Sequence, residues 1–316
     1  MPNIPSLDLS NFLSNNDVLK KDFVKRIGKA YQEIGFIALK GHFLTKDNID
    51  NLYLQIKKFF DLPQEIKSKY EFDGYKGQRG YTSFGKEHAK GKKEGDLKEF
   101  WHFGQFLDNQ NKNYNYPDNI IVDELPEFNK VGKETFKALE KTAAYILRAI
   151  SMFLDLEEDH FDKFVINGNS ILRPIHYPPI KKEPKKAVRA AAHGDINLIT
   201  LLMGAHGKGL QVKNNKGEWI DAIAADDEIV INVGDMLSRY TNDKLKSTIH
   251  RVVNPPKELW GKSRYSIPFF LHPIGSMKLN VLENCIDESN PKKFDDITAH
   301  DFLINRLIDI GVMKKE

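Results

Sequence analysis

The amino-acid sequence predicts a mainly β protein with flanking α-helices and a jelly-roll core. Short runs of β-branched and aromatic residues alternate with turns between about residues 165 and 275. Five or more short strands in a segment of this length are typical of a double-sheet jelly roll. Helical periodicity dominates the chain before residue 155. With 316 residues, of which 41% are hydrophobic, the chain can bury a sizeable core as one body.

Residues 1–120 form the N-terminal region in this prediction. It opens with the strand-like residues 4–10, and apolar residues four apart predict a helix over 19–35. Residues 35–41 (GFIALKG) favour a strand, and 44–63 a second helix that a proline ends. This order places two helices and two strands before the core.

Two loops and a long helix follow. Residues 73–97 are rich in Gly, Lys and Tyr without a clear period, so we expect a long loop that covers the site. Residues 108–118 form a second loop. Amphipathic helices are predicted for 126–155 and 297–310, and both support the jelly-roll core of 165–275. We expect the core and the N-terminal region to pack together.

Composition excludes several classes of protein. The net charge is +3 and the lysines are scattered, so nucleic-acid binding is not expected. The sequence lacks a run of about 18 apolar residues, which argues against a membrane span, and its start does not resemble a signal peptide. A single cysteine, Cys285, fits a reducing cytoplasm. The mildly cationic surface could attract acidic small molecules.

The residues that indicate chemistry are His193, Asp195, His250, Arg264 and Ser266. Two imidazoles and one carboxylate can hold a metal on one side only, leaving the other side for substrate or oxygen. If residues 191–202 form one strand, His193 and Asp195 point to the same face. The same rule places Arg264 and Ser266 together on a later strand. Ligand type alone would also allow zinc hydrolysis, which the arginine argues against.

These motifs resemble the isopenicillin N synthase-like family of Fe(II)- and 2-oxoglutarate-dependent oxygenases. HGD, HRVVNP and RYS carry the resemblance, together with IPSLDLS, GFIALKGH and FFDLPQEIK, and it covers roughly residues 1–275. The resemblance implies a double-stranded β-helix with Fe(II) on His193, Asp195 and His250. It also implies that 2-oxoglutarate and O2 are consumed, that succinate and CO2 are released, and that a C–H bond of a small molecule is oxidised, most often by hydroxylation.

The resemblance assigns the cosubstrate to Arg264, Ser266 and Tyr177. The guanidinium would bind the far carboxylate of 2-oxoglutarate as a planar fork. Many plant members have Asn-Tyr-Tyr-Pro where this chain has an Ile-His-Tyr-Pro run, and Ile175 cannot supply the amide. Isopenicillin N synthase shares the RxS pattern without using 2-oxoglutarate. An oxidase of that type is therefore one alternative, and a non-catalytic small-molecule-binding jelly roll is another.

Five further residues are predicted to contact the substrate, which we expect to be a small and acidic molecule. They are Arg79, Tyr81, Arg189, His176 and Phe270. The first two lie in the long loop, Arg189 precedes the HxD motif, and Phe270 lies on the strand after RxS. The substrate itself and the oligomeric state are not encoded in any short motif.

Overall fold

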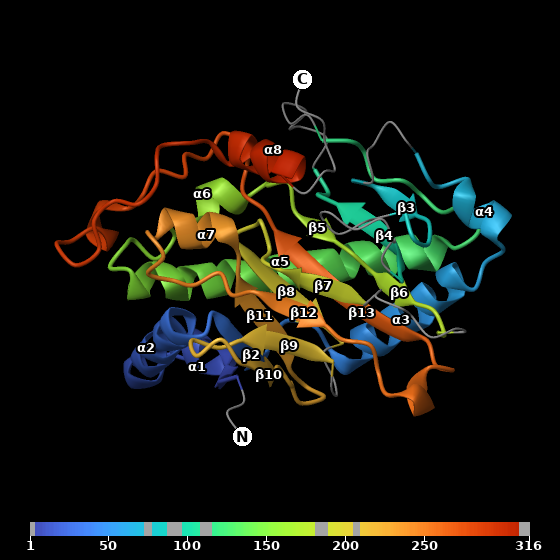
Figure 1. Ribbon diagram of the computed structural model, residues 1–316, viewed down its shortest axis with the longest axis horizontal. Coiled ribbons are helices and arrows are strands. Elements are labelled where there is room, and N and C mark those ends of the chain that lie inside the picture. Colours follow the sequence, from blue (N-terminus) through green and yellow to red (C-terminus); the bar gives the residue numbers. More distant parts are fainter. Residues whose placement is uncertain are drawn as a thin grey trace.

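Two facing β-sheets form the centre of the computed structural model (Figure 1), which describes residues 4–72, 78–86, 97–107, 116–180, 189–204 and 209–309. The larger sheet has the order β1 (Ser6–Asp8), β2 (Phe36–Lys40), β11 (Ile229–Val233), β8 (Ile199–Met203), β13 (Arg264–Leu271), β5 (Ile171–Leu172), β4 (Glu99–Gly104) and β3 (Gly80–Thr82), and β6 (Ile175–Tyr177) pairs with β13 and β4. The smaller sheet has the order β10 (Trp219–Asp221), β9 (Leu210–Lys213), β12 (His250–Val252) and β7 (Ala190–His193).

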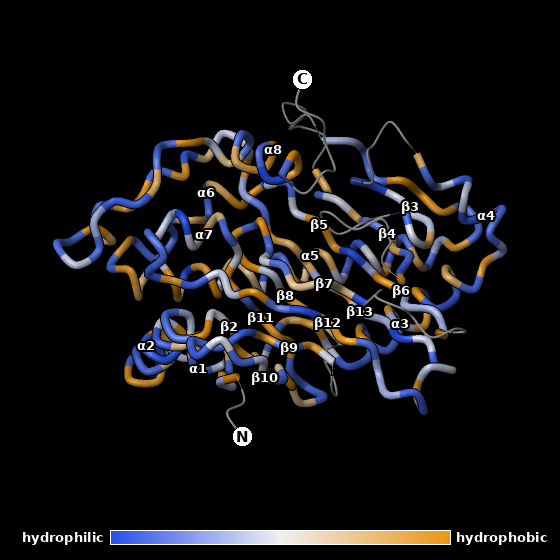
Figure 2. Tube along the Cα trace, viewed as in Figure 1, coloured by the Kyte–Doolittle hydropathy of each residue, from blue (hydrophilic) through white to orange (hydrophobic). Residues whose placement is uncertain are grey.

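The space between the two sheets is filled by apolar side chains. Phe36 and Val230 of the larger sheet pack against Leu210 and Val212 of the smaller one, and all four are buried. Because side chains alternate along a strand, each sheet turns its other face away from this interior. The strands at the centre of the molecule, β8 and β11 among them, carry long apolar segments, whereas loops at the rim are mostly hydrophilic (Figure 2).

The described part of the chain contains the helices α1 (Leu9–Leu13), α2 (Asp17–Glu33), α3 (Lys46–Phe60), α4 (Gln64–Ser68), α5 (Pro126–Phe153), α6 (Asp162–Val165), α7 (Asp235–Tyr240) and α8 (Ala299–Asp309). Among them, α2 and α5 pack directly on strands of the larger sheet. The long helix α5 runs behind the strands (Figure 1), and its Phe136 ring meets the edge of Phe269 on β13 with centroids 5.0 Å apart. The described helices include none that is long and apolar enough to cross a membrane.

The N-terminal region is built into the larger sheet. Strand β2 pairs antiparallel with β11, with Ala38 opposite Val230, and β1 pairs parallel with β2 at the edge. Helix α3 begins with a reciprocal cap between Thr45 and Asn48, which satisfies its first amide groups. Strands β1 and β2 therefore help to form the sheet that also carries Arg264 and Ser266 on β13.

Two segments differ from the sequence prediction, and the two predicted helices agree with it. The expected strand 191–202 is two strands, because β7 ends at His193 and β8 begins at Ile199. The expected loop 73–97 contains β3, although residues 73–77 and 87–96 lie outside the described part. The two predicted helices are found as α5 and α8. The mainly β jelly-roll class is the observed one.

Candidate iron and cosubstrate site

Three predicted ligands meet at the rim of the two sheets. His193 is the last residue of β7 and His250 the first of β12, and the two are direct cross-strand partners. Asp195 lies in the turn that follows β7. One ligand atom from each residue lies within 4.8 Å of the others. Oδ1 of Asp195 is 3.8 Å from Nε2 of His193 and 3.7 Å from Nε2 of His250.

Backbone carbonyl groups orient both imidazoles. Nδ1 of His193 lies 2.7 Å from the carbonyl oxygen of Ala191, and Nδ1 of His250 lies 3.2 Å from that of Thr248. A carbonyl only accepts, so each Nδ1 carries the hydrogen and each Nε2 presents a lone pair. Hydrogen bonds of this kind fix the ring and the tautomer of metal-binding histidines. Both rings are thus prepared to bind a cation through Nε2.

The carboxylate of Asp195 is held from the opposite side. Thr200 Oγ1 donates to Oδ2 at 2.6 Å and Asn232 Nδ2 donates to the same oxygen at 2.8 Å. Oδ1 is left facing the imidazoles. Burial alone would raise the pKa of Asp195, but His250, His193 and these two donors outweigh it and lower the pKa below its usual value. Asp195 is therefore ionised, as a metal ligand must be.

The three ligands differ in exposure. The side chains of Asp195 and His250 are 6% and 10% exposed, whereas that of His193 is 47% exposed. Burial lowers the pKa of His250, which keeps this imidazole neutral. Two buried ligands, one ionised carboxylate and one neutral imidazole, and a third ligand that is half exposed match a metal centre that keeps positions for exchangeable ligands.

The predicted cosubstrate residues lie on neighbouring strands. Arg264 of β13 is paired with Tyr177 of β6, and Ser266 with Ile175, so these side chains share the face that looks into the jelly roll. Gly209 allows the guanidinium to approach, because its φ is +133° and a methyl group there would lie 2.6 Å from Nη1 of Arg264. The structure therefore brings Arg264, Ser266 and Tyr177 together.

Phe270 lies beside Thr200, which donates a hydrogen bond to the metal ligand Asp195. It is directly opposite Thr200 across β13 and β8. The guanidinium of Arg173 lies between two rings, 4.6 Å from the centroid of Phe100 and 5.3 Å from that of Phe270. Nε of Arg173 also donates to Nε2 of His102. Sequence reasoning missed Arg173, although it is two residues before Ile175 and four before Tyr177 on the same face.

His272 is a further residue near Asp195 and Arg173. It follows Phe270 by two residues, and burial lowers its pKa to about 4, with opposing contributions from Asp195 and Arg173. The imidazole lies within electrostatic range of a metal ligand and of the arginine. Phe270, Arg173 and His272 are thus neighbours on the same side of the sheet as Thr200, the donor to Asp195.

Two residues predicted to contact substrate, His176 and Tyr81, lie in a different cluster. His176 is bonded through Nδ1 to Oε1 of Glu99 at 2.8 Å, and its ring stacks on Tyr265 at 4.9 Å. The hydroxyl of Tyr81 donates to the same carboxylate, which Lys67 also contacts at 2.8 Å. Strand alternation places this cluster on the outer face of the sheet, away from Tyr177 and the metal ligands.

The remaining two substrate predictions have separate outcomes. Arg79 is 1% exposed and donates to the carbonyl oxygens of Pro117 and Gln78 at 3.2 and 2.7 Å, so it braces the backbone of its own region. Arg189 is also buried, but its guanidinium carbon lies 5.4 Å from the centroid of the Tyr177 ring. The structure thus brings Arg189 to the cosubstrate residues and does not bring Arg79 there.

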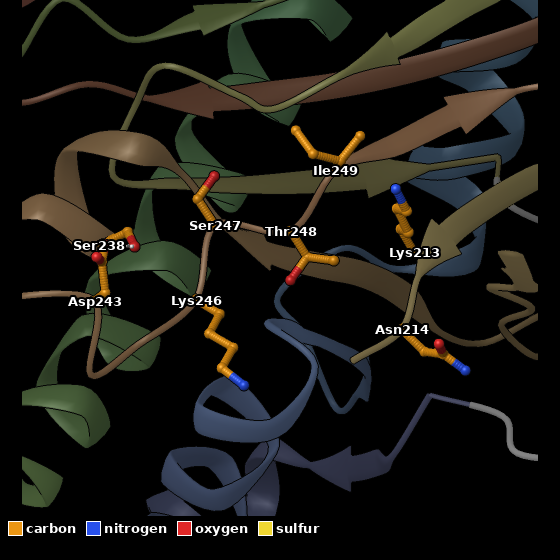
Figure 3. A pocket seen from close by; sticks show the side chains of 8 residues that line it. All are labelled: Lys213, Asn214, Ser238, Asp243, Lys246, Ser247, Thr248 and Ile249. Carbon is orange, nitrogen blue, oxygen red and sulfur yellow. Dashed lines mark hydrogen bonds between the residues drawn. The ribbon is translucent and has the colours of Figure 1, made fainter. Parts of the chain in front are cut away.

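A hollow of about 290 Å³ opens on the outer side of the segment that leads into β12 (Figure 3). Its lining residues are Lys213, Asn214, Ser238, Asp243, Lys246, Ser247, Thr248 and Ile249. Ile249 and His250 point to opposite sides of the chain, so the three metal ligands do not line this hollow. The hollow is separate from the metal site.

Comparison with known families matches both parts of the chain. Residues 4–124 match the N-terminal region named for the non-haem dioxygenase in morphine synthesis, and residues 168–273 match the 2OG-Fe(II) oxygenase superfamily. The chain belongs to the 2OG-Fe(II) oxygenase superfamily. It is thus an enzyme that depends on Fe(II) and 2-oxoglutarate.

Solved structures of similar proteins cover nearly the whole chain. A 2OG-Fe(II) oxygenase family protein from Caulobacter crescentus is 40% identical over 98% of this chain and 100% of its own, with a TM-score of 0.89. A full-length Neurospora crassa protein in complex with alpha-KG and thymine is 32% identical over 96% of each chain, with a TM-score of 0.83. Among curated relatives, the proline hydroxylase buaE of Petromyces alliaceus is 30% identical over 96% of this chain and 98% of its own.

Proposed function

We propose that this oxygenase binds Fe(II) through His193, Asp195 and His250 and hydroxylates a C–H bond of a small acidic molecule. The observation that carries the assignment is the convergence of two Nε2 atoms and one carboxylate oxygen within 4.8 Å. Bound iron, with 2-oxoglutarate and O2, supplies the oxidising power for the C–H bond. The residues of the chain bind the metal, the cosubstrate and the substrate, orient them, and select the substrate.

The donor set fits a ferrous ion. Each imidazole is fixed by a backbone carbonyl with Nε2 directed inward, and Asp195 is ionised and presents Oδ1. Thr200 and Asn232 occupy the other oxygen of Asp195, so the carboxylate offers one ligand atom in a fixed direction. Such outer contacts make a metal site selective and rigid.

We assign the far carboxylate of 2-oxoglutarate to Arg264, with Ser266 and Tyr177 as hydroxyl donors. A guanidinium binds a carboxylate with two parallel hydrogen bonds, which fixes direction as well as distance. All three side chains point into the jelly roll from β6 and β13. The keto end of the cosubstrate is thereby directed toward the metal ligands.

For the substrate, Arg173 replaces Arg79 and Tyr81 as the group that meets an acidic or carbonyl oxygen. Its guanidinium lies over the rings of Phe100 and Phe270 and is bonded to His102, so it has little rotational freedom to lose on binding. Phe270 also offers a ring face to a flat substrate. The similar Neurospora crassa protein has been solved in complex with thymine and with 5-formyluracil, and molecules of that size and shape fit this proposal.

Succinate release is the direct test. Purified protein is incubated with Fe(II) and 2-oxoglutarate, and amino acids, nucleobases and small carboxylic acids are screened for stimulated succinate formation. Stimulation by a substrate is the expected result. A substrate oxidised without 2-oxoglutarate would instead favour an oxidase of the isopenicillin N synthase type. A reducing compartment such as the cytoplasm belongs to the proposal because ferrous iron persists there.

A further inference from the structure

Two buried polar groups near Arg264 have no hydrogen-bond partner among the described residues. They are Nε of Arg189 and the hydroxyl of Tyr53. Arg189 as a whole is only 3% exposed. A buried donor without a partner costs free energy, so its presence calls for a ligand or another explanation.

Both groups lie near the predicted cosubstrate residues. The Arg189 guanidinium carbon lies 5.4 Å from the ring centroid of Tyr177, which is the cross-strand partner of Arg264. A methyl group at Gly204 would lie 2.5 Å from the Tyr53 hydroxyl and 3.6 Å from the Cα of Ser266, so this hydroxyl lies beside the RxS strand. Gly204, with φ at +84°, leaves the space open.

The electrostatics of this place favour an anion. Burial and the charge of Arg264 lower the pKa of Arg189 to about 10. Burial raises the pKa of Tyr53 to about 12, while Arg264 opposes the rise, so Tyr53 keeps its proton as a donor. The guanidinium groups of buried Arg189 and of Arg264 repel each other, and a carboxylate between them would remove that repulsion.

We propose that Arg189 and Tyr53, together with Arg264, hold the far carboxylate of 2-oxoglutarate as an arginine pair with a tyrosine donor. This inference rests on the proposed function and revises the prediction that Arg189 contacts substrate. Strand β7 supports it, because Arg189 directly precedes β7 and His193 ends it. In this proposal, Arg189 before β7 binds the far carboxylate of 2-oxoglutarate, and His193 at the end of β7 binds the metal at the keto end.

The experiment measures binding without turnover. Mn(II)-loaded protein, kept free of O2, is titrated by calorimetry with 2-oxoglutarate and with 2-oxovalerate, in which a methyl group replaces the far carboxylate. For Arg189→Gln we expect 2-oxoglutarate to bind roughly 10- to 100-fold more weakly, the range for losing a hydrogen bond to a charged group. Affinity for 2-oxovalerate should stay within about twofold, since it lacks the group that Arg189 contacts.

Three variants complete the series. Arg189→Lys keeps the charge but loses the fork, so its loss should be smaller. Tyr53→Phe should weaken 2-oxoglutarate binding by roughly two- to tenfold, the value of a neutral hydrogen bond. The matched control is Arg148→Gln, because Arg148 also lies over a ring, 5.2 Å from the centroid of Tyr145, but on helix α5. It should leave both affinities unchanged.

The outcomes separate this inference from the function it rests on. If Arg189→Gln binds 2-oxoglutarate within about twofold of wild type, or loses both ligands equally, the arginine pair is wrong. If wild-type protein itself does not bind 2-oxoglutarate, the proposed function is wrong. If Arg189→Gln loses substrate-stimulated turnover while its 2-oxoglutarate affinity is unchanged, Arg189 contacts the substrate and not the cosubstrate.

Discussion

The two faces of strands β4, β6 and β13 carry similar residue types and serve different purposes. On the outer face, the Glu99 carboxylate is contacted by Lys67 at 2.8 Å, by His176 at 2.8 Å and by Tyr81. On the inner face, arginine and tyrosine side chains surround a space beside the metal ligands. Both faces combine a histidine or arginine, a tyrosine and buried charge, so residue type alone does not separate them.

The difference lies in whether the groups satisfy each other. The carboxylate of Glu99 is matched by donors on both oxygens, and Nε2 of His176 is bonded to Ser263 at 2.9 Å. Near Arg264, which belongs to the inner face, Nε of Arg189 and the hydroxyl of Tyr53 have no partner among the described residues. A closed network stabilises a fold, whereas convergent groups with open valences indicate a binding site.

The largest effect that tests this contrast is on the metal. Asp195→Ala removes the only carboxylate of the triad, and we expect loss of Fe(II) binding and of detectable turnover with the fold intact. Equilibrium dialysis of Fe(II), succinate assays and circular dichroism measure the three properties. Normal turnover in this variant would remove Asp195 from the metal site.

At the cosubstrate end the effect is smaller and specific. Arg264→Ala should weaken 2-oxoglutarate binding by about 2–5 kcal/mol, the range for removing one partner of a desolvated charge pair. The apparent affinity is obtained from the 2-oxoglutarate dependence of succinate release. An affinity that barely changes would contradict the assignment of the cosubstrate to this face.

The outer face should respond in stability and not in chemistry. Glu99→Gln leaves Lys67 buried without its counter-charge, so we expect the free energy of unfolding to fall by about 3–5 kcal/mol. Urea unfolding measures the loss. Fe(II) affinity should be unchanged, and the double variant with Lys67→Met should recover part of the stability. If Glu99→Gln lost as much Fe(II) affinity as Asp195→Ala, the assignment of stability to the outer face and of binding to the inner face would be wrong.

The same carboxylate predicts a pH dependence. Burial would raise the pKa of Glu99, but hydrogen bonds from His176, Lys67 and Tyr81 outweigh it and lower the pKa below 4.5. The stabilisation by Glu99 is therefore complete above pH 4.5 and is lost as the pH falls through the lowered pKa. The stability gap between wild type and Glu99→Gln should narrow on acidification, as urea unfolding across pH would show. A constant gap would contradict the charge assignment.

The smallest effect concerns the support of Asp195. Asn232→Ala removes one donor to Oδ2 while Thr200 keeps the other. We expect metal affinity to fall by roughly 10- to 100-fold, as for other outer contacts of metal ligands. Competition with a chelator gives the affinity. No change would show that Thr200 alone orients the carboxylate.

Much of the architecture followed from local patterns in the sequence. The jelly-roll class and the long helix α5 were both predictable from periodicity and turn residues. The spacing of His193 and Asp195 was attributed to one continuous strand, whereas β7 ends between them. The turn brings Asp195 to the histidines through its bonds to Thr200 and Asn232, which no local pattern encodes.

Substrate-side residues were harder to predict because they depend on which face a strand turns inward. In ILRPIHYPP, alternation puts Arg173, Ile175 and Tyr177 on one side and His176 on the other. Applied strictly, that rule places Arg173 on the same side as Tyr177 and His176 on the opposite side. It could not have found Tyr53, which comes from helix α3 and reaches the site only through tertiary packing.

Strand β2, in the N-terminal region, contacts the metal-binding residue His250. Phe36 lies opposite Asn232 in the sheet, and its ring meets the edge of His250 with centroids 5.6 Å apart. These partners are separated by most of the polypeptide, and such distant pairings form late in folding. The surroundings of His250 are therefore complete only when β2 and β12, far apart in the sequence, are both in place in the folded sheets.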